Sequence, residues 1–262
     1  MMAWETEQVF QVLNRQILLF IFFATLSSYS FHSLVNIIYP ATTFRHEWNL
    51  QNKKLLFFIL FISGILVLVY SWRLREGWPF LALAAVPTFL YSAPNIPFRP
   101  FIFLRRIAIG KTIFLAIVWT YVTAAMPLLM SRVPFTPKQY YFMGSKLFLV
   151  YAICILFDVK DRSEDRKKGI RALPTILSEK AISIIYYLSL LFSLISTIMM
   201  FLSGMNNHVF SFMLIPIIIC IFCYHLAITR KDDFFYYFIL DGLMMLSALL
   251  QFIYLISITF VS

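Results

Sequence analysis

One stretch of the chain, from Ala181 to Thr229, contains no Lys, Arg, Asp or Glu. A transmembrane helix needs about 20 consecutive apolar residues, so this stretch is long enough for two such helices. The polar run SGMNNH at residues 203–208 lies between them and is the expected turn. An uncharged stretch of this length is unusual for a soluble domain. We therefore expect a chain that crosses a membrane at least twice.

The composition extends this prediction to the whole chain. Of its 262 residues, 61% are hydrophobic and 13% are charged, and the mean hydropathy is +0.82. Soluble domains carry about twice that share of charged residues. In a membrane protein, a net charge of +10 reflects topology and attraction to anionic lipid. We therefore expect the lipid bilayer as a partner and no nucleic acid.

Apolar runs elsewhere predict six further helices, at residues 17–39, 55–72, 78–91, 107–130, 140–157 and 234–262. The third of these is short and contains Pro87. The predicted fold class is therefore all-α, a polytopic bundle of about eight transmembrane helices that forms one domain over residues 1–262. The first residues are acidic and lack a basic segment, so we expect no cleavable signal.

The distribution of Lys and Arg predicts the orientation. With eight helices, sixteen of these residues lie on one side of the membrane and five on the other. The richer side should face the cytoplasm. We expect a multi-pass integral protein of the bacterial inner (cell) membrane, with the loops between residues 158 and 180 on the cytoplasmic side.

A pair of cysteines forms a motif that we do not interpret as a site. Cys220 and Cys223 form a C-x-x-C inside a predicted helix, with no second pair nearby, and we expect them to pack in the core. No internal repeat or low-complexity segment divides the chain.

Charged residues gather in one stretch, Asp158 to Pro174, which reads DVKDRSEDRKKGIRALP. Asp158, Asp161 and Asp165 are spaced i, i+3 and i+7, which places them on one side of a helix. Three carboxylates on one face repel, so a cation is expected among them. Mg²⁺ takes one or two carboxylates and bridges to substrate phosphates, and we predict it as the cofactor. The alternative is a solvated loop that only sets topology.

This stretch is similar to the second aspartate-rich motif of the UbiA-type intramembrane prenyltransferases. The three Asp residues match its acidic positions, and the tail matches at Gly169, Arg171, Leu173 and Pro174. The Y-S-x-P at residues 91–94, followed by a basic loop, also looks like a segment of that family. The resemblance extends from about Ile17 onward.

The resemblance implies a helical bundle whose cavity opens sideways to lipid. Such proteins transfer a prenyl group from a prenyl diphosphate to a hydrophobic acceptor, usually aromatic, with Mg²⁺. The resemblance also implies that Asp158, Asp161 and Asp165 are the metal ligands. We assign catalytic functions to Lys111 and Arg171, because cations stabilise a leaving pyrophosphate, and to Asp165 as a ligand of the metal that does the same. The predicted substrate-binding residues are His32, Tyr91, Arg99, Arg105, Arg106 and Asp241.

The chain departs from the family pattern in three ways. It has no Asp before Asp158, so the first aspartate-rich motif is missing. Eight helices are predicted where the family has nine, which indicates that the family's first helix is absent. Asn95 occupies the position of the Lys in the family's Y-x-x-x-K.

Simpler interpretations remain open for the individual residues. Arg105 and Arg106 can anchor a loop to anionic lipid, and Lys111 can extend its ammonium to the interface. Tyr91 can be an interfacial aromatic residue and His32 a packing residue. Asp241, an acid within a predicted span, is a site candidate or a partner of a structural Lys or Tyr.

Two functions follow. The first is a prenyltransferase that uses Mg²⁺ and a polyprenyl diphosphate. The alternative is a catalytically impaired homologue that acts as a membrane scaffold or lipid-binding protein. A transporter is a weaker third hypothesis, because the sequence lacks the paired broken helices that many transporters have.

Overall fold

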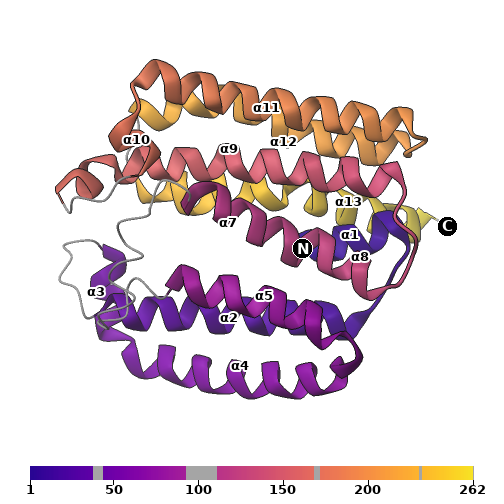
Figure 1. The fold of residues 1–262 in the computed structure, drawn as a ribbon, viewed down its shortest axis with the longest axis horizontal. Coiled ribbons are helices and arrows are strands. Elements are labelled where there is room, and N and C mark those ends of the chain that lie inside the picture. Colours follow the sequence, from indigo (N-terminus) through magenta and orange to yellow (C-terminus); the bar gives the residue numbers. More distant parts are fainter. Residues whose placement is uncertain (38–43, 93–110, 168–171, 230–231, 262) are drawn as a thin grey trace. The chain divides into compact units, whose positions relative to one another are not determined.

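The computed structural model describes residues 1–37, 44–92, 111–167, 172–229 and 232–261. Within these ranges the regular structure is helical throughout (Figure 1). The chain forms two compact units. Unit 1 contains residues 1–13 and 107–262, and unit 2 contains residues 14–106.

Unit 2 is built on two long antiparallel helices, α2 (Arg15–Asn36) and α4 (Lys53–Arg73), which pack along each other. The side chain of Asn14 caps α2 by accepting hydrogen bonds from the backbone N–H groups of residues 16 and 17. Shorter helices, α3 (Phe44–Gln51) and α5 (Trp78–Ser92), and a 3₁₀ turn at Arg75–Gly77 complete the unit.

Unit 1 contains the remaining helices. Their bounds are α1 (Met2–Phe10), α7 (Lys111–Thr120), α8 (Met126–Met130), α9 (Pro137–Lys167), α10 (Leu173–Ile176), α11 (Glu179–Leu202), α12 (Asn207–Thr229) and α13 (Asp241–Val261). Two π-helical segments interrupt the α-helical backbone. They are η4 (Tyr121–Ala125), between α7 and α8, and η5 (Phe235–Leu240), directly before α13.

The prediction of an all-α polytopic bundle is confirmed. Each of the eight predicted positions carries a helix, and seven of the helices in the described ranges are long and apolar enough to cross a membrane. The exception is α5, which has 15 residues and contains Pro87. The predicted turn at residues 203–208 separates α11 from α12.

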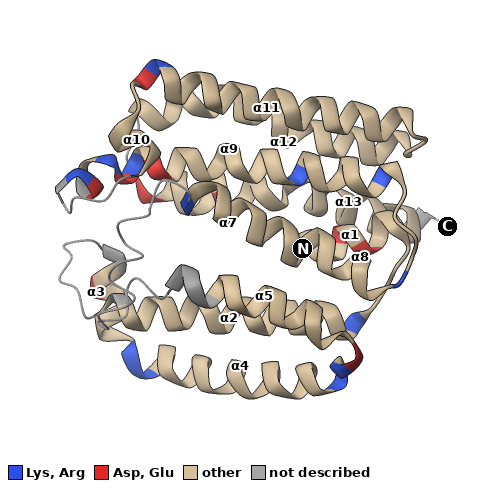
Figure 2. Ribbon diagram, in the orientation of Figure 1, with Lys and Arg blue, Asp and Glu red and all other residues tan. Residues whose placement is uncertain are grey.

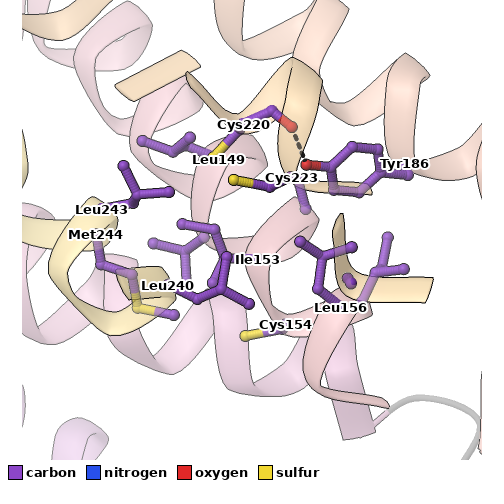
Figure 3. Packing of buried hydrophobic residues seen from close by; sticks show 14 of the residues in the cluster. Leu149, Ile153, Cys154, Leu156, Tyr186, Cys220, Cys223, Leu240, Leu243 and Met244 are labelled. Atoms are coloured by element: carbon purple, nitrogen blue, oxygen red, sulfur yellow. Dashed lines mark hydrogen bonds between the residues drawn. The ribbon is translucent and has the colours of Figure 1, made fainter. Parts of the chain in front are cut away.

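The long helix α9 is the centre of unit 1. It packs against α7, α11 and α12, and its residues Val150, Ile153 and Leu156 have no exposed surface. Figure 3 shows Ile153 and Leu156 surrounded by apolar residues of the neighbouring helices, with the Tyr186 hydroxyl donating a hydrogen bond to the Cys220 carbonyl. Cys220 and Cys223 are buried in this core as free thiols, which agrees with their interpretation as packing residues.

A helix that the sequence analysis did not predict, α1, packs against α8, η4 and α13 of the same unit. It brings Glu5 into the core, where the carboxylate lies 2.6 Å from the Lys146 ammonium of α9. Both side chains are almost fully buried, and Ser247 of α13 hydrogen bonds to each. Thr6 also donates a hydrogen bond to the carbonyl of Thr123 in η4, at 2.7 Å. Lys146, which lies within a membrane span, is therefore neutralised by a residue 141 positions away.

Candidate functional site at the acidic end of α9

The four acids of the charged stretch, at positions 158, 161, 164 and 165, belong to α9 itself. The sequence analysis ended this helix at Phe157, but it continues to Lys167. At about 1.5 Å per residue its 31 residues measure about 46 Å, more than the roughly 30 Å of a bilayer's hydrocarbon core. Part of α9 must therefore extend past the hydrocarbon. Figure 2 shows acidic and basic residues gathered at its C-terminal end.

The three Asp residues of α9 differ in exposure. Asp158 and Asp165 are partly buried, whereas Asp161 is exposed. The charges of Asp161, Asp165 and Lys111 all act on Asp158. A helical backbone through these positions keeps the predicted i, i+3 and i+7 spacing, so the carboxylates lie along one side of the helix end.

Helix α7 supplies a basic group and a hydroxyl group close to Asp158 of α9. Lys111 is its first residue and is exposed, and Thr112 is buried. The Thr112 hydroxyl donates a hydrogen bond to the Asp158 carboxylate. Ala116, four residues further along, has no exposed surface and allows α7 to pack closely on α9.

The sequence analysis missed Thr112. The available signal was a polar residue on a mostly apolar helix, four positions before the small residue Ala116. This signal is weak, because the hydroxyls of many threonines in helices hydrogen bond only to their own helix backbone.

Asp241 is the third contribution to this end of unit 1. It is the first residue of α13 and directly follows the π-helical segment η5, a feature that often marks functional sites in helical proteins. Cys154 of α9 lies within electrostatic range of Asp158, Asp241 and Lys111. The structure thus brings together five of the predicted site residues: Lys111, Asp158, Asp161, Asp165 and Asp241.

The other predicted site residues are placed differently. Arg99, Arg105, Arg106 and Arg171 lie outside the described residues, as does the side chain of Tyr91 in α5. His32 is partly buried on α2 of unit 2. The functions predicted for these four arginines and for Tyr91 therefore stay predictions.

The described residues fit a Mg²⁺ site that is completed by water and substrate phosphates better than a site built from protein ligands alone. No three His, Cys, Asp or Glu side chains among them lie close enough together to hold a metal ion, so they do not build an all-protein cage. Mg²⁺ does not require one, because it commonly binds one or two carboxylates and completes its shell with water and substrate phosphates. Asp161 and Asp165, one helical turn apart, have the spacing of such a pair. Asp158, the third predicted ligand, accepts a hydrogen bond from Thr112.

Replacing Thr112 with valine is expected to lower the free energy of unfolding by about 1–3 kcal/mol, since valine keeps the shape but leaves a partly buried carboxylate without its donor. Denaturant titration of the purified protein in detergent measures the change. Serine at this position keeps the hydroxyl and is expected to lose much less. Equal stability of the valine and serine variants would contradict the importance of this hydrogen bond.

Comparison with known protein families gives a match over most of the chain. The model of the UbiA prenyltransferase family matches residues 17–234. Neither the curated proteins nor the solved structures give a significant match to the chain.

Proposed function

The chain belongs to the UbiA prenyltransferase family, and from that premise we propose that it transfers a prenyl group from a polyprenyl diphosphate to a hydrophobic acceptor. The acceptor is an aromatic compound or a lipid. In this reaction the bond between the first prenyl carbon and the diphosphate oxygen breaks, and pyrophosphate leaves with the electron pair. The prenyl carbon forms a new bond to the acceptor, which releases a proton.

One observation supports this proposal above the others: α7, α9 and α13 bring acids and a lysine together where α9 extends past the hydrocarbon core. Asp161 and Asp165 have the spacing to hold Mg²⁺ in contact with a diphosphate. When bound there, Mg²⁺ would neutralise the charge that develops on the leaving pyrophosphate. The Lys111 ammonium, which acts electrostatically on Asp158, is positioned to attract phosphate oxygens.

We place the apolar part of the substrate against the membrane spans. The prenyl chain is a hydrocarbon, and the spans adjoining the acidic end are rich in apolar and aromatic side chains. A diphosphate held at the end of α9 therefore leaves its chain in contact with the membrane-embedded part of the bundle. Aromatic faces near the reacting carbon stabilise positive charge that builds up there.

Orientation and cell membrane are part of the proposal. The excess of Lys and Arg on the loops of one side supports a cytoplasmic acidic end. We place the protein in a bacterial inner membrane, with polyprenyl diphosphate supplied from the cytoplasm.

A second function is favoured by a specific observation. The chain has no Asp before Asp158, so an opposing aspartate-rich motif is missing from the preceding sequence. A homologue that kept the fold and lost turnover would act as a membrane scaffold or bind lipids without Mg²⁺.

Binding of a prenyl diphosphate to the purified protein distinguishes the two functions. We expect calorimetric titration to detect binding that requires Mg²⁺ and that is lost in Asp161→Ala and in Asp165→Ala. Glu76→Gln, which removes one acid from the turn between α4 and α5, is the matched control and should bind normally. Binding that is indifferent to Mg²⁺ and to both Asp variants would support the scaffold instead.

A further inference from the structure

Lys160 of α9 has three partners in the segment before α13. Its ammonium nitrogen lies 2.6 Å from a carboxylate oxygen of Asp233. The same nitrogen lies 4.2 Å from the ring centre of Tyr237 and 4.9 Å from that of Tyr236. Only 14% of the Lys160 side chain is exposed, compared with 52% for Asp233.

These contacts make the Lys160 pair stronger than an ordinary surface ion pair. Exposed pairs contribute little because water screens both charges. Here two aromatic rings cover the ammonium and add a cation–π attraction of their own. Arg162, two residues further along α9, shows the contrast: it pairs with Glu179 at 2.9 Å, but that Glu side chain is 74% exposed.

The partners of Lys160 are themselves held in place. The hydroxyl of Tyr236, a residue with no exposed surface, donates a hydrogen bond to the carbonyl of Ala227 in α12 at 2.9 Å. Asp232 accepts a hydrogen bond from the backbone N–H of Phe235 at 2.8 Å, which fixes the start of η5. Lys160 therefore joins the end of α9 to a segment that is anchored to the bundle.

The residue that follows Lys160 is Asp161, and the charges of Asp161 and Asp232 both act on Tyr236. We propose that Lys160 is a positioning residue: it fixes the last turns of α9, so that Asp161 and Asp165 keep the orientation that receives a metal-bound diphosphate. This inference rests on the proposed function, which supplies the diphosphate. Without the Lys160 ammonium, the C-terminal end of α9 would lose these contacts with the segment before α13.

Amide hydrogen exchange of the ligand-free protein tests whether Lys160 holds the helix end. In Lys160→Met and in Asp233→Asn, we expect the amides of residues 158–167 to exchange about tenfold faster than in the unchanged protein. Arg162→Gln, which breaks the neighbouring ion pair of the same helix, is the matched control and should have a much smaller effect. Unchanged exchange in both Lys160→Met and Asp233→Asn, or equal acceleration in Arg162→Gln, overturns the proposal.

Kinetics then separate positioning from a purely structural effect. Lys160→Met and Asp233→Asn should each raise the Mg²⁺ concentration for half-maximal prenyl transfer about tenfold, and the double variant should be no worse than either single one. Lys160→Arg keeps the cation and should stay near the original value. A loss of folded protein with an unchanged Mg²⁺ midpoint overturns the positioning function.

The two proposals fail in different ways. If the protein with its original sequence shows no Mg²⁺-dependent prenyl transfer, the prenyltransferase function is contradicted. The exchange experiment needs neither Mg²⁺ nor substrate, so it still decides whether Lys160 fixes the end of α9.

Discussion

Replacing Lys146 with methionine is expected to lower the free energy of unfolding by about 3–5 kcal/mol. Methionine has a similar length and fills the same space, so the loss comes from charge and not from packing. The substitution leaves the carboxylate of Glu5, which is 1% exposed, without its ammonium partner in the core of unit 1. The Ser247 hydroxyl would still donate a hydrogen bond to that carboxylate oxygen. Unfolding by denaturant in detergent micelles measures the change.

Two further variants test this explanation. Glu5→Gln should destabilise the protein to a similar extent, because it removes the carboxylate that lies 2.6 Å from the buried Lys146 ammonium. The double variant Lys146→Met/Glu5→Leu should recover most of the loss, since replacing both members of a buried pair with apolar residues is often neutral. Lys138→Met, which removes a partly buried lysine of the same helix that donates a hydrogen bond to the Gly204 carbonyl, is the control. If Lys146→Met is no less stable than Lys138→Met, the ion pair does not stabilise the bundle.

Asp161→Asn is expected to reduce kcat/KM for prenyl transfer by about 100- to 1000-fold, the loss typical of removing one group that stabilises transition-state charge. Asparagine keeps the size of the side chain and removes its charge, so metal-assisted departure of pyrophosphate should suffer while the fold is kept. Asp165→Asn should have an effect of similar size, because the two carboxylates lie one helical turn apart. Single-turnover measurements with a radiolabelled prenyl diphosphate provide the rate.

The matched control is Asp232→Asn, which makes the same charge change at the same end of unit 1. Asn also caps helical segments well, so this variant should keep the hydrogen bond to Phe235. A similar loss in Asp232→Asn and Asp161→Asn would indicate a general effect of net charge. Full activity of Asp161→Asn would contradict a metal-binding function for this residue.

The number and position of the long helices could be predicted because hydropathy is a local property. Each span is recognised from about 20 neighbouring residues, whatever the rest of the chain does. The i, i+3 and i+7 spacing of the acids also needs only the helix that carries them. The prediction missed that α9 continues to Lys167, because charged residues are compatible with a helix that leaves the bilayer and with a loop.

The contacts between helices could not be predicted in this way. Glu5 and Lys146 are 141 positions apart, and the acidic N-terminal residues predicted no helix at all. Thr112 and Asp158 form a pair because α7 packs on α9, and Lys160 and Asp233 form a pair because the segment before α13 reaches α9. No periodicity in one segment contains that information.

The amino-acid sequence by itself determined that this protein crosses a membrane as a helical bundle and that one helix end carries three aligned carboxylates. It also carried the family resemblance that the family match confirms. Only the tertiary structure decided which charges neutralise one another and that Asp241 of α13 lies near the acids of α9. The physical reason is that insertion into a bilayer depends on the composition of each segment, whereas ion pairs and hydrogen bonds depend on distances of about 3 Å between segments far apart in the chain.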